Sequence, residues 1–290
     1  ARFSTAANQT YSIDTNGQSI TLATALTSSG GSMTKLGAGT LTLSAANSYT
    51  GGTTVSVGTL KLGNAAALGA SANTVSVTSS AVLDLNGQTV TNTNPLTLNG
   101  TGITSAGALI NSSATAASYA GTVALATNSS IGGTSGNITL SGVISGSGTL
   151  TKVGTNSITL SGNNTYSGAT TVSAGTLNIT NNNGLGATSA GTTVASGATL
   201  DLLNVAVGAE TVTLNGGTLA DATSSLAGDV TLTANSTISV TNLADTFTMS
   251  GAISGAYSIT KTGAGTLVLT GANTYGATTI SAGVLQVGAG

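Results

Sequence analysis

The sequence predicts a single all-β domain over residues 1–290, built as a parallel β-helix (β-solenoid) of about 13–15 coils. Three observations lead to this fold class: a long motif that occurs three times, short alternating strands separated by turn residues, and a nearly uncharged composition. Strands spaced by about 8–12 residues also suit a sandwich or a barrel. A long internal period that contains shorter near-repeats favours the solenoid.

The motif is clearest where three segments of about twenty residues are compared. They are "TLTLSAANSYTGGTTVSVGTL" from Thr40, "SITLSGNNTYSGATTVSAGTL" from Ser157 and "TLVLTGANTYGATTISAGVL" from Thr266. Between residues 35–62 and 152–179, 15 of 28 residues are identical without a gap. The third copy is one residue shorter between its Tyr and its "ATTISAG".

A lysine precedes each copy and sets the long period. Lys35, Lys152 and Lys261 are separated by 117 and 109 residues. These intervals divide the chain into a partial repeat (1–34), repeat 1 (35–151), repeat 2 (152–260) and a partial repeat 3 (261–290). The least regular part is the middle, about residues 99–130.

Within each large repeat, strands of three to five residues alternate with Gly, Asn or Ser turns. In repeat 1 they are, in order, "TLTLS", "TTVSV", "TLKLG", "TVSVT", "AVLDLN", "QTVT" and "PLTLNG". Coils of about 20 residues, stacked at the inter-strand spacing of about 4.8 Å, give about five or six coils per large repeat. Apolar residues at alternate strand positions predict an inner stack that includes Leu41, Leu43, Val55, Leu60, Ile158, Leu160, Val172, Leu177, Leu267, Leu269, Ile280 and Leu285.

Composition supports a solenoid and excludes several functions. Charged residues are 4% of the chain, against roughly a quarter in ordinary domains, and like charges stacked in register would repel one another. A net charge of -2 gives no electrostatic footprint for nucleic acid. The apolar runs are far shorter than the ~20 residues of a membrane span, so none is predicted. Without Cys or His, thiol nucleophiles, His-based triads and Cys/His zinc sites are excluded.

The threefold pattern of Lys, alternating aliphatics, Asn, Tyr and "TT[VI]S" resembles the autotransporter-associated β-strand repeat, also called the passenger-associated transport repeat. The core of the motif covers about 30 residues in each of three places. This resemblance implies a right-handed parallel β-helix exported to the bacterial cell surface as a passenger. The C-terminal barrel domain of a whole autotransporter is missing from the sequence.

Recurrence decides how the candidate site residues are interpreted. Asp84 and Asp201 occupy equivalent points of the repeats and are assigned to turns. The three lysines are interpreted as solubilising charges on the face of the rod, or as a thin binding stripe. For the motif tyrosines, packing with the adjacent Asn is favoured over sugar stacking: Tyr49, Tyr166 and Tyr275. The motif asparagines are assigned to turns or side-chain ladders: Asn47, Asn164 and Asn273.

Asp221, Asp229 and Asp245 form the only acidic cluster in the sequence. A carboxylate pair for glycoside hydrolysis, or a calcium site, would have to come from these residues. The stretch from Lys152 to Lys261 offers such a pair no basic partner, so solvated turns are favoured. We therefore predict no catalytic, cofactor-binding or metal-binding residues, and no cofactor.

We predict a non-enzymatic extracellular structural protein, acting as a stalk or fibre-forming subunit at the bacterial surface. The alternative is an adhesin passenger that binds a host factor or a glycan, and a more remote one is a polysaccharide-active β-helix enzyme. The chain begins "ARFSTAANQT", without Met or an apolar segment, and ends in mid-repeat at "VLQVGAG". A processed chain or a fragment is therefore expected, as is continuation of the polypeptide or end-to-end self-association through open coil ends.

Overall fold

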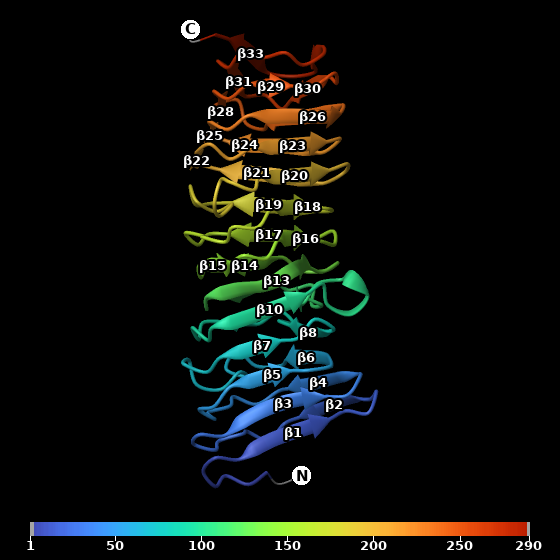
Figure 1. Cartoon of the computed structure of the whole chain (residues 1–290), viewed down its shortest axis with the longest axis vertical. Coiled ribbons are helices and arrows are strands. Elements are labelled where there is room, and N and C mark those ends of the chain that lie inside the picture. Colours follow the sequence, from blue (N-terminus) through green and yellow to red (C-terminus); the bar gives the residue numbers. More distant parts are fainter. Residues whose placement is uncertain (1–2, 289–290) are drawn as a thin grey trace.

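The computed structural model describes residues 3–288 as a straight stack of parallel β-strands, with the two ends of the chain at opposite ends of a rod (Figure 1). All named strand pairs are parallel, and each coil lies on the one before it. The chain makes about 13 turns, which confirms the predicted solenoid and its coil number. At about 4.8 Å per coil the rod is about 60 Å long.

Each coil has three faces, which we number in chain order. Face 1 consists of β1 (Thr10–Asp14), β3 (Ser32–Leu36), β5 (Thr53–Val55), β7 (Val75–Val77), β10 (Leu96–Gly100), the first half of β13 (Val123–Gly132), β15 (Ile144–Gly146), β22 (Ala206–Val207), β25 (Ser225–Leu226), β28 (Thr246–Met249), β31 (Thr266–Leu269) and β33 (Val284–Val287). Between β15 and β22 this face continues as loops. The Thr165 N–H, for example, donates to the Ile144 carbonyl of the coil before it, 2.8 Å away.

Face 2 has a strand in nearly every described coil, and face 3 has strands from β9 onward. Face 2 consists of β2 (Ser19–Leu22), β4 (Thr40–Leu43), β6 (Gly58–Leu62), β8 (Ala81–Asp84), β11 (Leu109–Ile110), the second half of β13, β16 (Leu150–Lys152), β18 (Thr170–Val172), β20 (Thr192–Ala195), β23 (Val212–Asn215), β26 (Val230–Ala234) and β29 (Ile253–Ser254). Face 3 consists of β9 (Thr89–Val90), β12 (Ala117–Tyr119), β14 (Ile138–Leu140), β17 (Ser157–Leu160), β19 (Thr176–Ile179), β21 (Thr199–Leu203), β24 (Thr218–Ala222), β27 (Ser236–Val240), β30 (Ile259–Thr262) and β32 (Thr278–Ile280).

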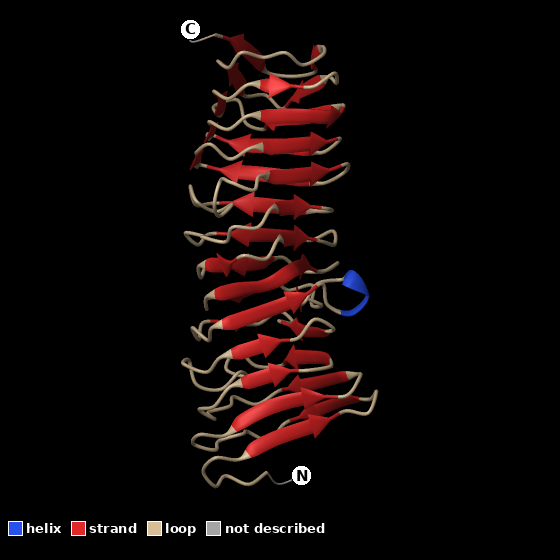
Figure 2. Cartoon of the chain, viewed as in Figure 1, coloured by secondary structure: helices blue, strands red, loops and turns tan. Residues whose placement is uncertain are grey.

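One short 3-10 helix, η1 (Ile103–Ser105), interrupts this pattern within the described residues. It projects from the side of the rod between β10 and β11, where the sequence is least regular (Figure 2).

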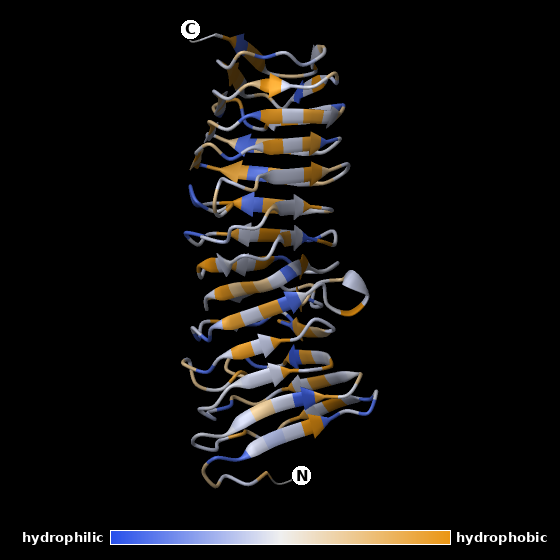
Figure 3. Cartoon of the chain, in the orientation of Figure 1, coloured by the Kyte–Doolittle hydropathy of each residue, from blue (hydrophilic) through white to orange (hydrophobic). Residues whose placement is uncertain are grey.

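The inner stack follows from strand alternation. In β4, β17 and β31 every second residue is buried, and the in-register partners Leu41, Leu60, Leu83 and Leu109 lie over one another. Apolar and polar residues accordingly alternate along many of the strands (Figure 3). Ten of the twelve predicted core residues are buried.

The other two predicted core residues behave differently. Ile280 is 52% exposed and Leu285 is only partly buried. Both belong to the last coil that the structure describes, which has no described coil over it. The prediction that Ile280 is a core residue is therefore wrong for this structure.

The large repeat does not return to the same face. Lys35 lies on β3 of face 1, Lys152 on β16 of face 2 and Lys261 on β30 of face 3. Each large repeat therefore advances the chain by five coils plus one face. At about 4.8 Å per coil, one repeat lengthens the rod by about 26 Å. The same motif thus occurs on each of the three faces in turn.

Candidate functional site

The three motif lysines are buried inside the rod, so their interpretation as charges on its surface is wrong. Lys35, Lys152 and Lys261 are 0–1% exposed. In "MTK", "LTK" and "ITK" the lysine lies two positions after a buried apolar residue, so it points to the same, inner side of the strand. Its ammonium therefore ends at the inner side of the corner that leads to the next face.

Each ammonium there is surrounded by backbone carbonyls. Lys152 Nζ donates to the carbonyls of Val153 (2.9 Å), Gly154 (2.7 Å) and Ala174 (3.0 Å), of which Ala174 belongs to the next coil. Lys261 Nζ makes the same three contacts, to Thr262, Gly263 and Ala282. Lys35 Nζ reaches Leu36, Gly37 and Val57, and also Thr15 Oγ1 at 2.9 Å.

The corner leaves room for the lysine because of a glycine one coil later. Gly58 and Gly175 have φ of +74° and +65°, and a Cβ at either would come within 3 Å of the lysine Nζ. Burial lowers the pKa of all three lysines, that of Lys152 to about 8, so Lys152 is still protonated at neutral pH. Three N–H donors then match three carbonyls. The lysine is a structural cation that joins two coils at a corner.

The motif asparagines bridge neighbouring coils through the backbone. Asn164 Oδ1 accepts from the Ile144 N–H (2.8 Å), and its Nδ2 donates to the Gly184 carbonyl (2.7 Å). Asn47 makes equivalent bonds to Leu26 and Ala67, and Asn273 accepts from Ile253.

The motif tyrosines are packing residues too, but their partner is a Thr rather than the Asn. Tyr49 and Tyr166 are fully buried, with hydroxyls bonded to Thr53 and Thr170. Tyr275 is partly buried and its hydroxyl lies 2.7 Å from Thr278 Oγ1. The recurrent tyrosines therefore do not form an outward-facing row of sugar-stacking sites in the described chain.

The acidic cluster does not converge on a cleft. Asp221 is 2% exposed and points inward between Leu202 and Val240, and neither carboxylate oxygen makes a hydrogen bond of good geometry in the described chain. Ser224 and Thr223 lie near it and partly oppose the effect of burial. Burial raises its pKa to about 6. Asp245 lies near the same corner, bonded to Thr223 and Asn242, whereas Asp229 lies at another corner and accepts from the Ala252 N–H. Among residues 3–288 no group of three or more acidic side chains is placed to hold a metal ion.

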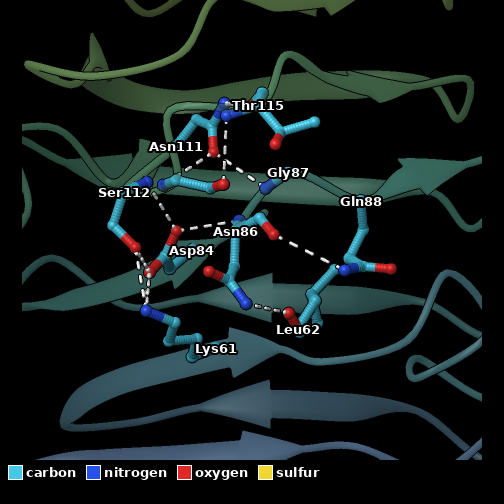
Figure 4. A network of polar contacts seen from close by, with 10 residues as sticks. Lys61, Leu62, Asp84, Asn86, Gly87, Gln88, Asn111, Ser112 and Thr115 are labelled. Atoms are coloured by element: carbon cyan, nitrogen blue, oxygen red, sulfur yellow. Dashed lines mark hydrogen bonds and ion pairs between the residues drawn. The ribbon is translucent and has the colours of Figure 1, made fainter.

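Repeat 1 carries a surface polar network that repeat 2 lacks. Asp84, on β8, accepts from the backbone N–H of Asn86 (2.9 Å) and from the backbone and hydroxyl of Ser112 (3.0 and 2.6 Å). Lys61, on β6, donates to Ser112 Oγ (3.0 Å) and lies 3.8 Å from Asp84 Oδ2 (Figure 4). This is the one ion pair in the described part of the chain.

Register identifies the corresponding residues of repeat 2. Asn178 and Asp201 are paired as Lys61 and Asp84 are, and Ala222 takes the place of Ser112. Asp201 thus keeps the carboxylate but has neither partner, and burial raises its pKa. The network is therefore not part of the repeated motif. Sequence reasoning missed Lys61 and Ser112, although their absence from the second copy is visible in the sequence.

A groove and a cavity lie beside this network. The groove, of about 440 Å³, is lined by Ser19, Thr40, Thr42, Thr59, Lys61, Asp84, Ile110 and Ser112. The cavity, of about 270 Å³, lies next to the η1 loop and is lined by Ser105, Ala106, Ile110, Asn111, Ser112, Gly133, Thr134, Ser135, Val153 and Gly154. Ile110 and Ser112 belong to both, so the two form one surface region, which we call the repeat-1 groove.

The fold and the inward-facing motif define the class of protein, a repeat protein built as a parallel β-solenoid. The model of the passenger-associated transport repeat matches residues 33–62, 150–179 and 259–287. Each match begins on a strand that carries a buried lysine. The chain therefore contains three copies of the passenger-associated transport repeat and is similar to autotransporter passengers.

A curated relative supports this assignment. Over 273 residues the chain is 34% identical to the adhesin BmaC autotransporter of Brucella suis biovar 1 (strain 1330). The match covers 91% of this chain and 7% of that adhesin. No solved structure gives a significant match. In residues 3–288 no helix has the length and apolar character needed to cross a membrane.

Proposed function

We propose that the chain is a non-enzymatic, extracellular structural segment that serves as a stalk at the bacterial surface. The observation that carries this proposal is the direction of the repeated residues. The lysines of all three motif copies are buried, as are Asn47, Asn164, Tyr49, Tyr166 and most of the aliphatic residues. The repeated residues thus serve to build the rod, and each large repeat adds about 26 Å to its length.

The shift of one face per repeat favours a spacer over a repeated binding stripe. Because Lys35, Lys152 and Lys261 lie on three different faces, outward residues at equivalent motif positions do not align along one side of the rod. A multivalent ligand on one side would not meet them together. The surface location is inferred from the passenger repeats and from the adhesin relative.

Two other functions were predicted as alternatives. The first is a passenger that binds a surface glycan or a host factor; the name of the relative, an adhesin, is consistent with it, and this function is compatible with a stalk. For a polysaccharide-active enzyme, two carboxyls would have to face one cleft about 5–10 Å apart. The inward direction of Asp221 and the separate corner of Asp229 argue against it.

The stalk proposal is tested by removing one large repeat in phase. Deletion of residues 36–152 joins Lys35 to Val153 and preserves the motif. We expect a folded rod that is shorter by about 26 Å, measured as the maximum dimension in small-angle X-ray scattering and by negative-stain electron microscopy. A compact particle, or loss of β-structure in this variant, would contradict the proposal.

A deletion one residue shorter, of residues 36–151, is the matched control. It shifts the strand by one position, which would turn the inward side chains outward. This variant is expected to lose the far-UV circular dichroism of β-structure. Equal stability of the two deletions would show that the phase of the repeat does not matter and would also contradict the proposal.

A further inference from the structure

Repeat 1 contains an insertion that repeat 2 lacks. After the shared "TLNG", nine positions separate Gly100 from Leu109, whereas three separate the equivalent Gly216 from Leu219. The six additional residues include η1 and project from the rod (Figure 2). In solenoids, insertions of this kind map to loops on one face and often form a binding surface.

The insertion has a defined conformation. The Ala106 and Gly107 N–H groups donate to the carbonyls of Ile103 (3.1 Å) and Thr101 (3.0 Å). Thr104 and Ser105 have φ of 51° and 58°, a left-handed region that is uncommon for residues other than Gly and rare for the β-branched Thr. Strained backbone of this kind is concentrated at binding and active sites. The loop holds Ser105 and Ala106 at the edge of the cavity.

Three features of repeat 1 that repeat 2 lacks meet in one place. The inserted loop borders the cavity, Ser112 lines both the cavity and the groove, and Lys61 lies in the groove. At the equivalent positions repeat 2 has a short turn, Ala222 and Asn178.

The chemistry of the repeat-1 groove limits the class of ligand. Its hydroxyls at Ser19, Thr40, Thr42, Thr59, Thr134 and Ser135 make no side-chain hydrogen bonds within the described chain, so they are available to a ligand. Lys61 is 32% exposed and has further N–H donors. Its charge is matched by Asp84, so the groove has no excess charge for an anionic ligand.

A peptide strand fits the groove poorly. Strands β4, β6 and β8 each have a parallel neighbour on both sides, so no free sheet edge is present there for strand addition. The cavity is lined mostly by apolar surface, to which Ile110, Ala106 and Val153 contribute and against which the apolar face of a sugar ring would pack. The hydroxyls of the groove supply the donors and acceptors that a polyhydroxylated ligand needs. The cavity, about 270 Å³, is near the lower limit of ligand pockets and suits a group the size of one sugar ring.

We propose that the repeat-1 groove binds a neutral oligosaccharide, with one sugar ring in the cavity beside the η1 loop and the adjoining rings along the hydroxyls beside Lys61. Lys61 donates to sugar hydroxyls, and Asp84 holds Lys61 and Ser112 in position. This gives the chain a lateral binding site in addition to its length. The site does not depend on the stalk function, which the deletion of residues 36–152 tests separately.

The test uses a glycan array of neutral, sialylated and sulfated oligosaccharides, followed by titration calorimetry with the strongest neutral ligand on the array. Two variants convert repeat 1 to the residues that repeat 2 already has. One deletes residues 101–106, which restores the short Gly-Gly connection, and the other is the double substitution Lys61→Asn and Ser112→Ala. Because repeat 2 folds with these features, both variants are expected to keep the wild-type circular dichroism spectrum.

We expect the wild-type chain to bind neutral glycans and each variant to bind at least tenfold more weakly. Thr42→Ala should also weaken binding, whereas the equivalent substitution in repeat 2, Thr159→Ala, should leave it unchanged. Any of three results would overturn the proposal: no neutral glycan is bound, only acidic glycans are bound, or the two repeat-2-like variants bind as the wild type does.

Discussion

The buried lysine at a corner of the solenoid allows a quantitative test with Lys152→Met. Methionine retains most of the apolar stem and the volume of the side chain but removes the ammonium. In the native chain Nζ supplies hydrogen bonds to the carbonyls of Val153, Gly154 and Ala174, at 2.7–3.0 Å. The substitution therefore leaves three carbonyls at the corner without this donor.

The magnitude follows from two opposing contributions. A buried acceptor left without its donor costs about 1–3 kcal/mol, so three carbonyls set an upper limit of roughly 9 kcal/mol. Removal of a buried charge recovers a desolvation penalty of several kcal/mol. We expect a net loss of about 3 kcal/mol in the free energy of unfolding, since the carbonyls remain directed inward after the ammonium has gone.

The assay is equilibrium urea unfolding followed by far-UV circular dichroism, with hydrogen exchange to locate the loss. Exchange should accelerate most in the coils that contain Gly154 and Gly175, because solenoid repeats interact mainly with their neighbours. Lys61→Met is the matched control, and loss of its partly exposed ion pair should cost about 1 kcal/mol or less. An unchanged or higher stability of Lys152→Met would refute the structural role of the lysine.

Two further predictions concern other inward polar residues. Asp221→Asn should stabilise the chain at pH 7 by about 1–3 kcal/mol, because repeat 1 has Asn111 at the equivalent position and because Asp221 is buried without a partner. Its raised pKa of about 6 means that the folded chain binds more protons than the unfolded chain between pH 3.8 and 6. The contribution of Asp221 to the stability of the wild-type chain is thus greatest below about pH 4 and is lost as the pH rises through 6. The difference between the urea midpoints measured at pH 4.5 and at pH 7.5 should therefore be smaller in the variant than in the wild type. Asn164→Ala should cost about 2 kcal/mol in urea unfolding, since it removes bonds to two neighbouring coils, whereas the exposed Asn163→Ala should change stability by less than half as much. A pH difference as large in Asp221→Asn as in the wild type, or equal effects of the two asparagine variants, would contradict these assignments.

The sequence was sufficient for much of the fold because of its regularity. Alternation with a period of two predicted which residues of "TLTL" and "SITL" point inward, and Leu41, Leu43, Ile158 and Leu160 are buried as expected. The same parity placed Lys35, Lys152 and Lys261 inside. The usual preference of lysine for the surface led to the opposite interpretation. The carbonyls that accept hydrogen bonds from the ammonium belong to a corner, and the strand pattern does not predict the geometry of that corner.

The repeat-1 groove could be predicted only in part. The sequence marked residues 99–130 as irregular, and comparison of the two copies exposes the insertion and the substitutions at Lys61 and Ser112. It did not show that these three features meet. Lys61 and Ser112 are 51 residues apart in the chain, and the stacking of β6, β8 and β11 brings them within 3.0 Å.

The sequence by itself determined the class of fold, the coil number and the repeated brick, because these depend on local alternation and on self-similarity along the chain. The tertiary structure decided which face each copy occupies, which residues stack in register and where the lysines end. These depend on the exact number of residues in every coil and corner, which changes from coil to coil. Some differences in length are looped out, as at η1, and others are absorbed in the corners, so contacts across coils are fixed only when the whole rod is assembled.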